Sequence, residues 1–253
     1  MQTVRMTLVV LLLAMFAALT RPKFPDRIGV VHSIVASILV HGFYLGGTAV
    51  AIHHSVPAGL SALIPGLQPV LTSTLASRFL GESVTRVQWL GLLLGLAGVM
   101  MVLHTREMTG QSAIGWIASG VSLVSITLGT LYQKRFCGHI DWRAGNLVQF
   151  IAVAIFFAIG AWLFETRTIV WDAQFVLAIG WLVVMLSVGS IALLYWLIRK
   201  SAATRVASFF YLVPGVTALM AYLLFGERLD ALSIVGMVVC AAGVVLVNRR
   251  ATS

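Results

Sequence analysis

Long apolar runs separated by short polar linkers make up nearly the whole chain. Each run has about the 20 residues that an α-helix needs to cross the hydrocarbon core of a bilayer. No polar stretch long enough for a soluble domain lies between them. The predicted spans are residues 4–20, 29–52, 57–79, 87–104, 112–133, 145–164, 174–198, 204–225 and 231–248. The pattern therefore predicts an all-α integral membrane protein with nine spans.

The apolar pattern repeats at a shift of 145 residues, which aligns 68–102 with 213–247 without a gap. The first four spans correspond to the last four, and the span at 112–133 has no counterpart. The two copies lie five spans apart, an odd number, so they are expected to be inverted in the membrane. We divide the chain into a first repeat, residues 1–108, and a second, residues 109–253. Inverted repeats are typical of secondary transporters, whose substrate site lies near the midplane between them.

Composition and charge agree with a membrane protein. Hydrophobic residues make up 60% of the chain and charged residues only 10%, whereas soluble domains carry about 25% charge. The net charge of +9 could suggest nucleic acid, but the cations stand in small groups between apolar runs, so no such partner is expected. Of the 17 Lys and Arg residues, only Arg5, Arg106, Arg167 and Arg228 fall on one side, against 13 on the other. This bias predicts a cytoplasmic C-terminus.

The first apolar run has a second interpretation. MQTVR followed by an apolar stretch resembles a signal peptide. However, no A-x-A-like cleavage site follows, and residues 21–27 carry three cations. These features favour a retained helix followed by a cytoplasmic loop.

Uncharged polar side chains in the spans are the candidate substrate-binding groups, because all carboxylates and cations lie at loops or span ends. This distribution argues against a carboxylate proton relay and against hydrolysis inside the membrane. The candidates are His41, Tyr44, Gln68, Ser125, Tyr195 and Tyr211. His41 and Tyr44 lie three residues apart on one helix face, and His41 is the candidate for proton coupling. The alternative is that these groups only join helices by hydrogen bonds.

Prolines and Gly-Glu pairs occupy matched positions in the repeats. Pro69 and Pro214 lie inside spans, where proline kinks a helix. The kink could serve as a hinge, or it could be only a packing feature. Gly81-Glu82 and Gly226-Glu227 are predicted structural turns, whose carboxylates can cap the N–H groups of the next helix.

Small residues indicate where helices pack closely. The spacing Gly91-x-x-x-Gly95-x-x-Gly98 favours a tight helix contact within the monomer or, alternatively, a dimer face. Cys240 takes the repeat position of Gly95, which predicts a packing role. Cys137 and Cys240 show no metal-ligand spacing or disulfide framework, and no metal or cofactor is expected.

The repeated motifs resemble the EamA family of the drug/metabolite transporter superfamily. The resemblance covers nearly the whole chain, including residues 41–72, and rests mainly on one motif that occurs twice. These copies are Pro69, Gly81-Glu82, Gly91 and Gly98, and Pro214, Gly226-Glu227, Gly236 and Gly243. It implies ten helices with both ends cytoplasmic, so this chain would begin at the family's second helix and lack the first.

The resemblance implies export of small metabolites across the bacterial inner membrane, by alternating access between the repeats. The substrate would be amino-acid-like or another small amphipathic solute. The partners would be that solute and the lipid bilayer, with the protein a monomer or homodimer and not an enzyme. Two alternatives are a non-transporting membrane assembly subunit and an integral-membrane transferase. The transferase would have to use the group His53, His54 and His104, which has no acidic partner.

Overall fold

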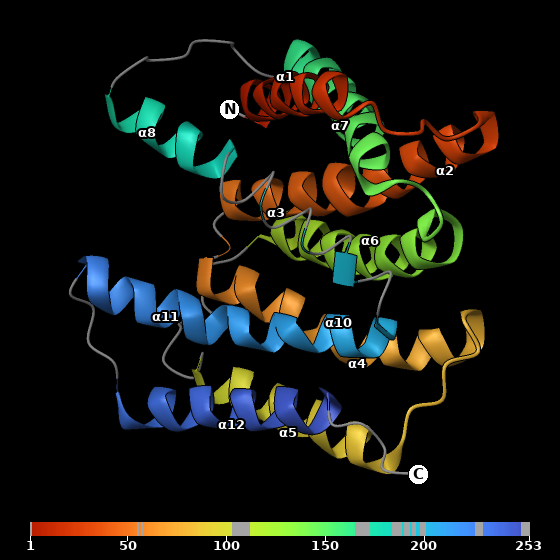
Figure 1. The fold of residues 1–253 in the computed structure, drawn as a ribbon. Helices are drawn as coiled ribbons and strands as arrows, with labels where there is room; N and C mark the ends of the chain where they lie inside the picture. The colour runs from red at the N-terminus through yellow and green to blue at the C-terminus, as the bar shows by residue number, and fades with distance from the viewer. Residues whose placement is uncertain are drawn as a thin grey trace. The chain divides into compact units, whose positions relative to one another are not determined.

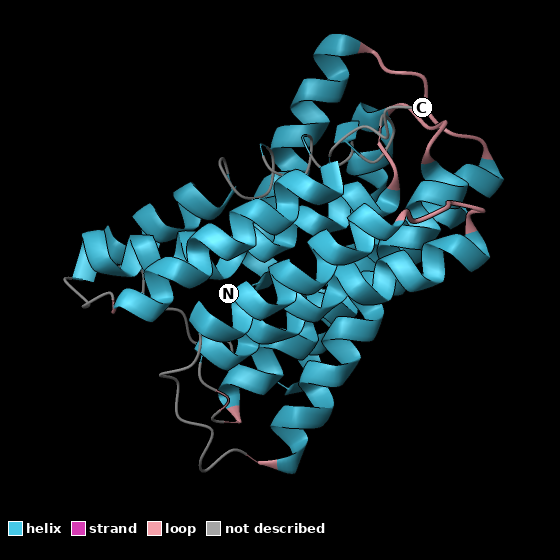
Figure 2. Cartoon of the chain, turned by 90° about the horizontal axis from the view of Figure 1, so that it is seen from below, coloured by secondary structure: helices cyan, strands magenta, loops and turns pink. Residues whose placement is uncertain are grey.

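The structure is a computed structural model. It describes residues 2–54, 56, 58–102, 112–164, 173–183, 189, 193, 196–197, 201–225 and 230–248. Over these residues the chain is almost entirely helical and has no β-strand (Figure 2). Five helical segments are long and apolar enough to cross a membrane: Gln2–Thr20, Arg27–His53, Ala113–Cys137, Trp142–Leu163 and Ala231–Asn248. The predicted all-α membrane class is confirmed, while the number of spans stays a prediction.

The helices follow the predicted apolar runs (Figure 1). Their bounds are α1 Gln2–Thr20, α2 Arg27–Ser37, η1 Ile38–Phe43, α3 Tyr44–His53, α4 Ala58–Phe79, α5 Arg86–Val102, α6 Ala113–Cys137, α7 Trp142–Phe164, α8 Ala173–Trp181, α10 Ala203–Ser208, η3 Phe209–Tyr211, α11 Leu212–Phe225 and α12 Ala231–Asn248. They form two compact units, unit 1 with residues 1–42 and 132–200, and unit 2 with residues 43–131 and 201–253. Each unit therefore contains helices from both repeats.

In unit 2, glycines bring α5 and α12 into backbone contact. A Cβ added at Gly91 would lie 2.8 Å from the carbonyl oxygen of Gly243, and one added at Gly98 would lie 2.7 Å from that of Gly236. Residue numbers rise along one helix as they fall along the other, so the helices are antiparallel. Gly91 and Gly236 share one repeat position, and Gly98 and Gly243 share another. The pair therefore has the pseudo-two-fold symmetry that inverted repeats predict, and its glycines pack within the chain.

Polar contacts at the ends and centre of this pair obey the same symmetry. The Gln88 side-chain amide donates to the carbonyl of Val247, 3.3 Å away. Its repeat equivalent, Ser233, donates its hydroxyl to the carbonyl of Val102, 3.4 Å away. Between them, the Cys240 thiol faces the carbonyl of its own equivalent, Gly95, at 3.6 Å. Cys240 is buried, and its small side chain fits the close approach, as the sequence predicts.

Unit 1 contains a second pair of repeat-related helices, α1 and α7, which pack against each other. The Thr3 hydroxyl donates to the carbonyl of Phe157, 3.1 Å away. Near the other end of α1, the ring of Phe16 lies 5.9 Å from that of Trp142. The numbering again runs in opposite directions, so this pair is also antiparallel.

The second span is interrupted by a π-helical turn. Residues Ile38–Phe43 form η1 between α2 and α3. In the second repeat, Leu182, Val183 and Gly189 are also π-helical, and the shift of 145 places them around the same position. π-turns are rare and often mark functional segments. The chain passes from unit 1 to unit 2 inside η1, between Gly42 and Phe43.

Helix α4 ends at the predicted Gly-Glu turn. Gly81 has a φ of +68°, a left-handed conformation that favours glycine at helix ends. The next N–H group, of Glu82, turns back toward the carbonyl of Ala76, 3.4 Å away. The matched pair Gly226-Glu227 lies outside the described residues.

Replacing Gly81 with alanine is expected to destabilise the protein by about 1 kcal/mol, because an L-residue pays roughly that cost at positive φ. Equilibrium unfolding of the purified protein would measure the change. A Cβ at Gly81 meets nothing within 4 Å, so a steric clash would not contribute. A Gly81→Asn variant should lose less, because asparagine tolerates this conformation, and equal losses would contradict the conformational explanation.

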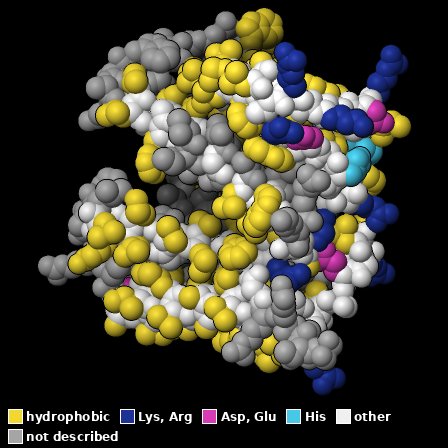
Figure 3. Space-filling model, in the orientation of Figure 1, with side chains coloured by type: hydrophobic (Ala, Val, Ile, Leu, Met, Phe, Trp, Pro, Cys, Tyr) yellow, Lys and Arg dark blue, Asp and Glu magenta, His cyan; other side chains and the backbone are white. Residues whose placement is uncertain are grey.

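Large apolar side chains are exposed on the helix surfaces. Leu19 is 77% exposed, Ile117 67% and Leu177 74%. Figure 3 shows hydrophobic side chains over the helices of each unit, while Lys and Arg gather toward helix ends. Such surfaces suit a lipid environment, where apolar side chains need no cover from protein.

Candidate functional site

Unit 2 contains a buried polar group on α4 and α6 that includes the predicted site residue Gln68. The Gln68 side-chain N–H donates to the Thr130 hydroxyl, 3.3 Å away. Its side-chain carbonyl oxygen has no hydrogen-bond partner in the described part of the chain. One turn further along α4, the buried Thr72 hydroxyl also lacks a partner. Residues four apart share a helix face, so α4 carries two adjacent unsatisfied polar groups.

Tyr211 brings a third unsatisfied group to unit 2. It lies in η3, is 0% exposed, and packs its ring against Gly95, where an added Cβ would clash with the ring. Its hydroxyl has no partner among the described residues. Buried tyrosine hydroxyls are normally hydrogen-bonded, and α4 packs against η3. The arrangement can therefore offer hydrogen bonds to a small molecule.

Unit 1 holds a separate polar group between α2–η1 and α7, and it includes the predicted site residue His41. Ser33, Ser37 and His41 recur every four residues along their span. The Ser37 hydroxyl donates to the backbone carbonyl of Gln149, and the buried His41 ring stacks on Phe150 at 5.2 Å.

Two residues that the sequence analysis missed complete this group. The Asn146 side-chain oxygen and both polar side-chain atoms of Gln149 are buried without a partner in the described chain. Their signal was present in the sequence, since two amide side chains three residues apart interrupt an apolar span. The candidates chosen from the sequence lie in other spans and include one amide, Gln68, but not this pair.

Arg5 also differs from its expected setting. The sequence analysis placed it among the loop cations, but it lies in α1 and is only 8% exposed. Its guanidinium donates to the side-chain oxygen of Gln2 at 3.4 Å. Arg5 can occupy this place because its long side chain keeps polar contacts while its stem is buried.

The other predicted site residues divide between the units. Tyr44, beyond the π-turn in unit 2, is half-buried, and its backbone carbonyl accepts from the Ser122 hydroxyl at 2.8 Å. The α-helical spacing that places His41 and Tyr44 on one face does not hold across a π-turn. Ser125 is buried on α6, and Tyr195 lies outside the described residues. A single cavity formed by all these residues stays a prediction.

The two prolines have different local structures. Pro69 is buried within α4, which continues to Phe79, and its carbonyl accepts from the Ser73 hydroxyl at 2.6 Å. Pro214 is the third residue of α11, directly after the 3-10 turn η3. The interrupted helix is thus the one with Pro214, while a hinge at either proline stays a prediction.

Glu82 caps a helix, but a different one from the helix that its sequence position suggests. Both of its carboxylate oxygens lie 3.0 Å from the N–H group of Ala203, the first residue of α10. The helix that follows Glu82 already has its own cap, because Thr85 and Gln88 exchange backbone-to-side-chain hydrogen bonds of 2.9 and 3.3 Å. The N-cap residue of α10, Ala202, has no capping side chain. Glu82 supplies the acceptor and suits the positive end of the helix dipole.

A model of the EamA-like transporter family matches residues 1–104 and 113–249. The chain belongs to this family. The resemblance seen in the sequence motifs is therefore confirmed, and the protein is a multi-pass membrane transporter.

Several proteins named as transporters are similar in sequence to this chain along most of its length. The Bacillus subtilis transporter YvbV is 29% identical over 228 residues, which are 86% of this chain and 71% of that protein. The Escherichia coli inner membrane transporter YedA is 27% identical, over 94% of this chain and 77% of its own. An Escherichia coli protein named a probable amino-acid metabolite efflux pump is 24% identical. The match covers 88% of this chain and 77% of that protein. This EamA-like chain also superposes on a crystal structure of a protein with 16% sequence identity, with a TM-score of 0.72. The match covers 97% of this chain and 96% of the other, which supports the fold.

Proposed function

We propose that this EamA-like protein is a secondary transporter of the bacterial inner membrane that exports small amino-acid-like or other amphipathic metabolites. Membership of the family supports transport, and the relative named an amino-acid metabolite efflux pump supports the substrate class and the direction. YedA, named an inner membrane transporter, supports the location. The cation bias of the loops supports a cytoplasmic C-terminus.

The observation that carries the proposal is the set of buried polar groups that have no hydrogen-bond partner among the described residues. In an apolar helix, an unsatisfied buried hydroxyl or amide costs free energy, because the group loses water without gaining a hydrogen bond. Gln68, Thr72 and Tyr211 carry such groups in unit 2. A substrate that hydrogen-bonds to them would offset the cost. These groups are uncharged, which favours a neutral, zwitterionic or amphipathic solute.

The mechanism we propose is alternating access. The antiparallel pair α5–α12 would act as a rigid part of unit 2, because backbone contact and matched hydrogen bonds hold it. The pair α1–α7, which also packs together, would be the corresponding part of unit 1. The π-turn η1, through which the chain passes from one unit to the other, would absorb the change in backbone angles. His41 lies in this turn and remains the candidate for proton coupling. No catalytic role is proposed.

Counterflow of amino-acid metabolites into proteoliposomes would test the proposal. We expect Thr72→Val and Tyr211→Phe each to lower flux about tenfold, a loss that corresponds to one hydrogen bond of roughly 1.4 kcal/mol. The same variants should be as stable as the wild type or more so, because each removes an unsatisfied buried hydroxyl. Gln68→Leu should also lower flux.

Thr127→Val is the matched control. Thr127 is equally buried, but its hydroxyl already donates to the carbonyl of Leu123 at 2.8 Å, so flux should be unchanged. Full flux in the Thr72, Tyr211 and Gln68 variants would mean that these groups serve only packing. Absence of wild-type counterflow with every metabolite tested would favour the non-transporting subunit.

A further inference from the structure

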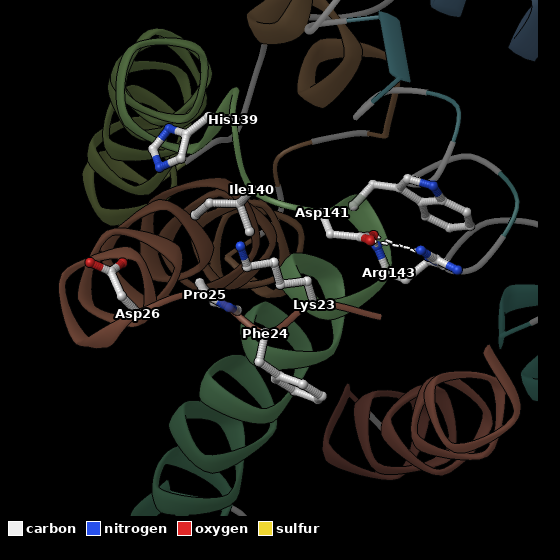
Figure 4. Close-up of a pocket in the computed structure, with 9 residues that line it drawn as sticks. Lys23, Phe24, Pro25, Asp26, His139, Ile140, Asp141 and Arg143 are labelled. Atoms are coloured by element: carbon white, nitrogen blue, oxygen red, sulfur yellow. Dashed lines mark hydrogen bonds and ion pairs between the residues drawn. The ribbon is translucent and has the colours of Figure 1, made fainter. Parts of the chain in front are cut away.

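The loops of unit 1 enclose a cavity of about 700 Å³ at the ends of the helices. One side is formed by the α1–α2 loop with Lys23, Phe24 and Asp26, and the other by the α6–α7 junction with Asp141, Trp142 and Arg143. Figure 4 shows Lys23 extended between the two loops, with Asp26 on one side and the Asp141–Arg143 pair on the other. None of the buried polar residues discussed above lines this cavity, although Arg143 lies only three residues before Asn146.

The charges around this cavity favour an anion. Residues 21–27 and 134–143 contain six cations and two carboxylates. Both carboxylates have internal partners, because Asp26 accepts from the N–H of Gly29 at 2.9 Å and Asp141 binds the Arg143 guanidinium at 2.7 Å. Lys23 is exposed and has no partner among the described residues. The cavity therefore offers an unpaired ammonium, while its carboxylates are occupied.

Arg143 can contribute further donors. An arginine guanidinium stays charged in proteins. Asp141 engages Nε and one Nη, and a guanidinium has five N–H donors in all. Phosphate groups are the anions that Arg and Lys bind best together, since they accept several charge-assisted hydrogen bonds.

Two features place this cavity at the membrane boundary. It lies where α1 and α6 end and where α2 and α7 begin, and Trp142 is of the residue type enriched at lipid–water interfaces. Phe24 is 56% exposed beside these cations. Arg21, the first residue after α1, has a φ of +44°, a conformation that costs a non-glycine residue energy. An exposed aromatic side chain beside cations suits a ligand with an apolar part and an anionic head.

We propose that this cavity binds the head group of an anionic phospholipid, with its phosphate on Lys23 and Arg143 and its acyl chains beside Phe24. Basic pockets between membrane helices recognise such head groups by the same contacts. Bound lipid would join the α1–α2 loop to the α6–α7 junction and thereby stabilise unit 1. The proposal does not depend on what the protein transports.

Native mass spectrometry of the full-length protein, purified and delipidated in detergent, would test this site. We expect phosphatidylglycerol to bind more tightly than phosphatidylcholine. Lys23→Gln should weaken phosphatidylglycerol binding about fivefold and Lys23→Glu roughly 25-fold, because each unit of charge near an anionic head group is worth about that factor. Arg78→Gln is the matched control, since Arg78 is an exposed cation at the end of α4 that does not line the cavity.

Equal weakening by Lys23→Gln and Arg78→Gln would overturn the proposal in favour of general surface attraction. Equal affinity of the wild type for the two lipids would overturn it as well. Titration with inorganic phosphate separates the two possible sources of the phosphate group. If millimolar phosphate binds and displaces phosphatidylglycerol, the ligand is a soluble phosphate compound and the lipid proposal fails.

Discussion

Gly98→Ala is expected to destabilise the protein by about 3 kcal/mol, the upper part of the range for overpacked interiors. The added Cβ would lie 2.6 Å from the backbone N of Cys240 and 2.7 Å from the carbonyl oxygen of Gly236. Backbone atoms cannot move aside as a flexible side chain can, so α5 and α12 would have to separate. Separation would also weaken the terminal hydrogen bonds of Gln88 and Ser233. Equilibrium unfolding in mixed micelles would measure the loss.

Two variants make this prediction specific. Gly120→Ala on α6 is the matched control, because a Cβ there meets nothing within 4 Å, and alanine favours a helix over glycine by about 1 kcal/mol. Gly243→Ala should lose about as much stability as Gly98→Ala, since the two glycines share one repeat position. A Gly98→Ala protein as stable as the Gly120→Ala protein would refute the close helix contact. A large loss at Gly98 with none at Gly243 would refute the symmetry of the pair.

Glu82→Ala is expected to cost about 2 kcal/mol, the loss of a charged hydrogen bond at a helix end. The change would leave the first N–H group of α10 without its acceptor, because Ala202 cannot replace it. The effect should be local, so hydrogen exchange followed by mass spectrometry should show faster exchange in residues 203–208. Exchange in α5 should stay unchanged, since Thr85 and Gln88 cap that helix independently.

Conservative variants separate the charge of Glu82 from its hydrogen bond. Glu82→Gln keeps an acceptor and removes the charge, so it should lose about half as much stability as Glu82→Ala. The control Thr85→Ala should instead speed exchange at the start of α5 and spare α10. If Glu82→Ala speeds exchange in α5 but not in α10, the carboxylate acts on its own neighbouring helix, as its sequence position first suggests.

Much of the fold could be predicted from the sequence because membrane helices are encoded locally. A run of about 20 apolar residues is sufficient to predict a helix in lipid, where backbone groups must bond within the segment. The repeat then predicted relations between distant helices. Gly91, Gly98, Gly236 and Gly243 stood at matched positions, and α5 and α12 pack antiparallel through them. Gly81 was expected in a turn and has the positive φ of one.

The candidate site was less predictable, because lipid and protein interior are both apolar and the hydrophobic pattern does not separate helix faces. Gln68 and Tyr211 could be chosen as polar residues in spans. However, nothing local indicated that the Gln68 side-chain oxygen and the Tyr211 hydroxyl lack partners in the described part of the chain. Asn146 and Gln149 were passed over, and Arg5 was counted with the loop cations although its side chain is buried in α1. The π-turn at His41 was also unforeseen, because the apolar pattern of residues 29–52 continues through it without interruption.

The sequence by itself determined the helical class, the repeat and the family, because each depends on residue type and spacing along the chain. Only the tertiary structure decided the partners across the chain: Glu82 with the start of α10, Cys240 with Gly95, and Lys23 with the cavity beside Arg143. These contacts join segments that are far apart in sequence. They depend on how whole helices pack. The local sequence pattern around each residue would be the same if the residue contacted a different segment, so the pattern does not specify the partner.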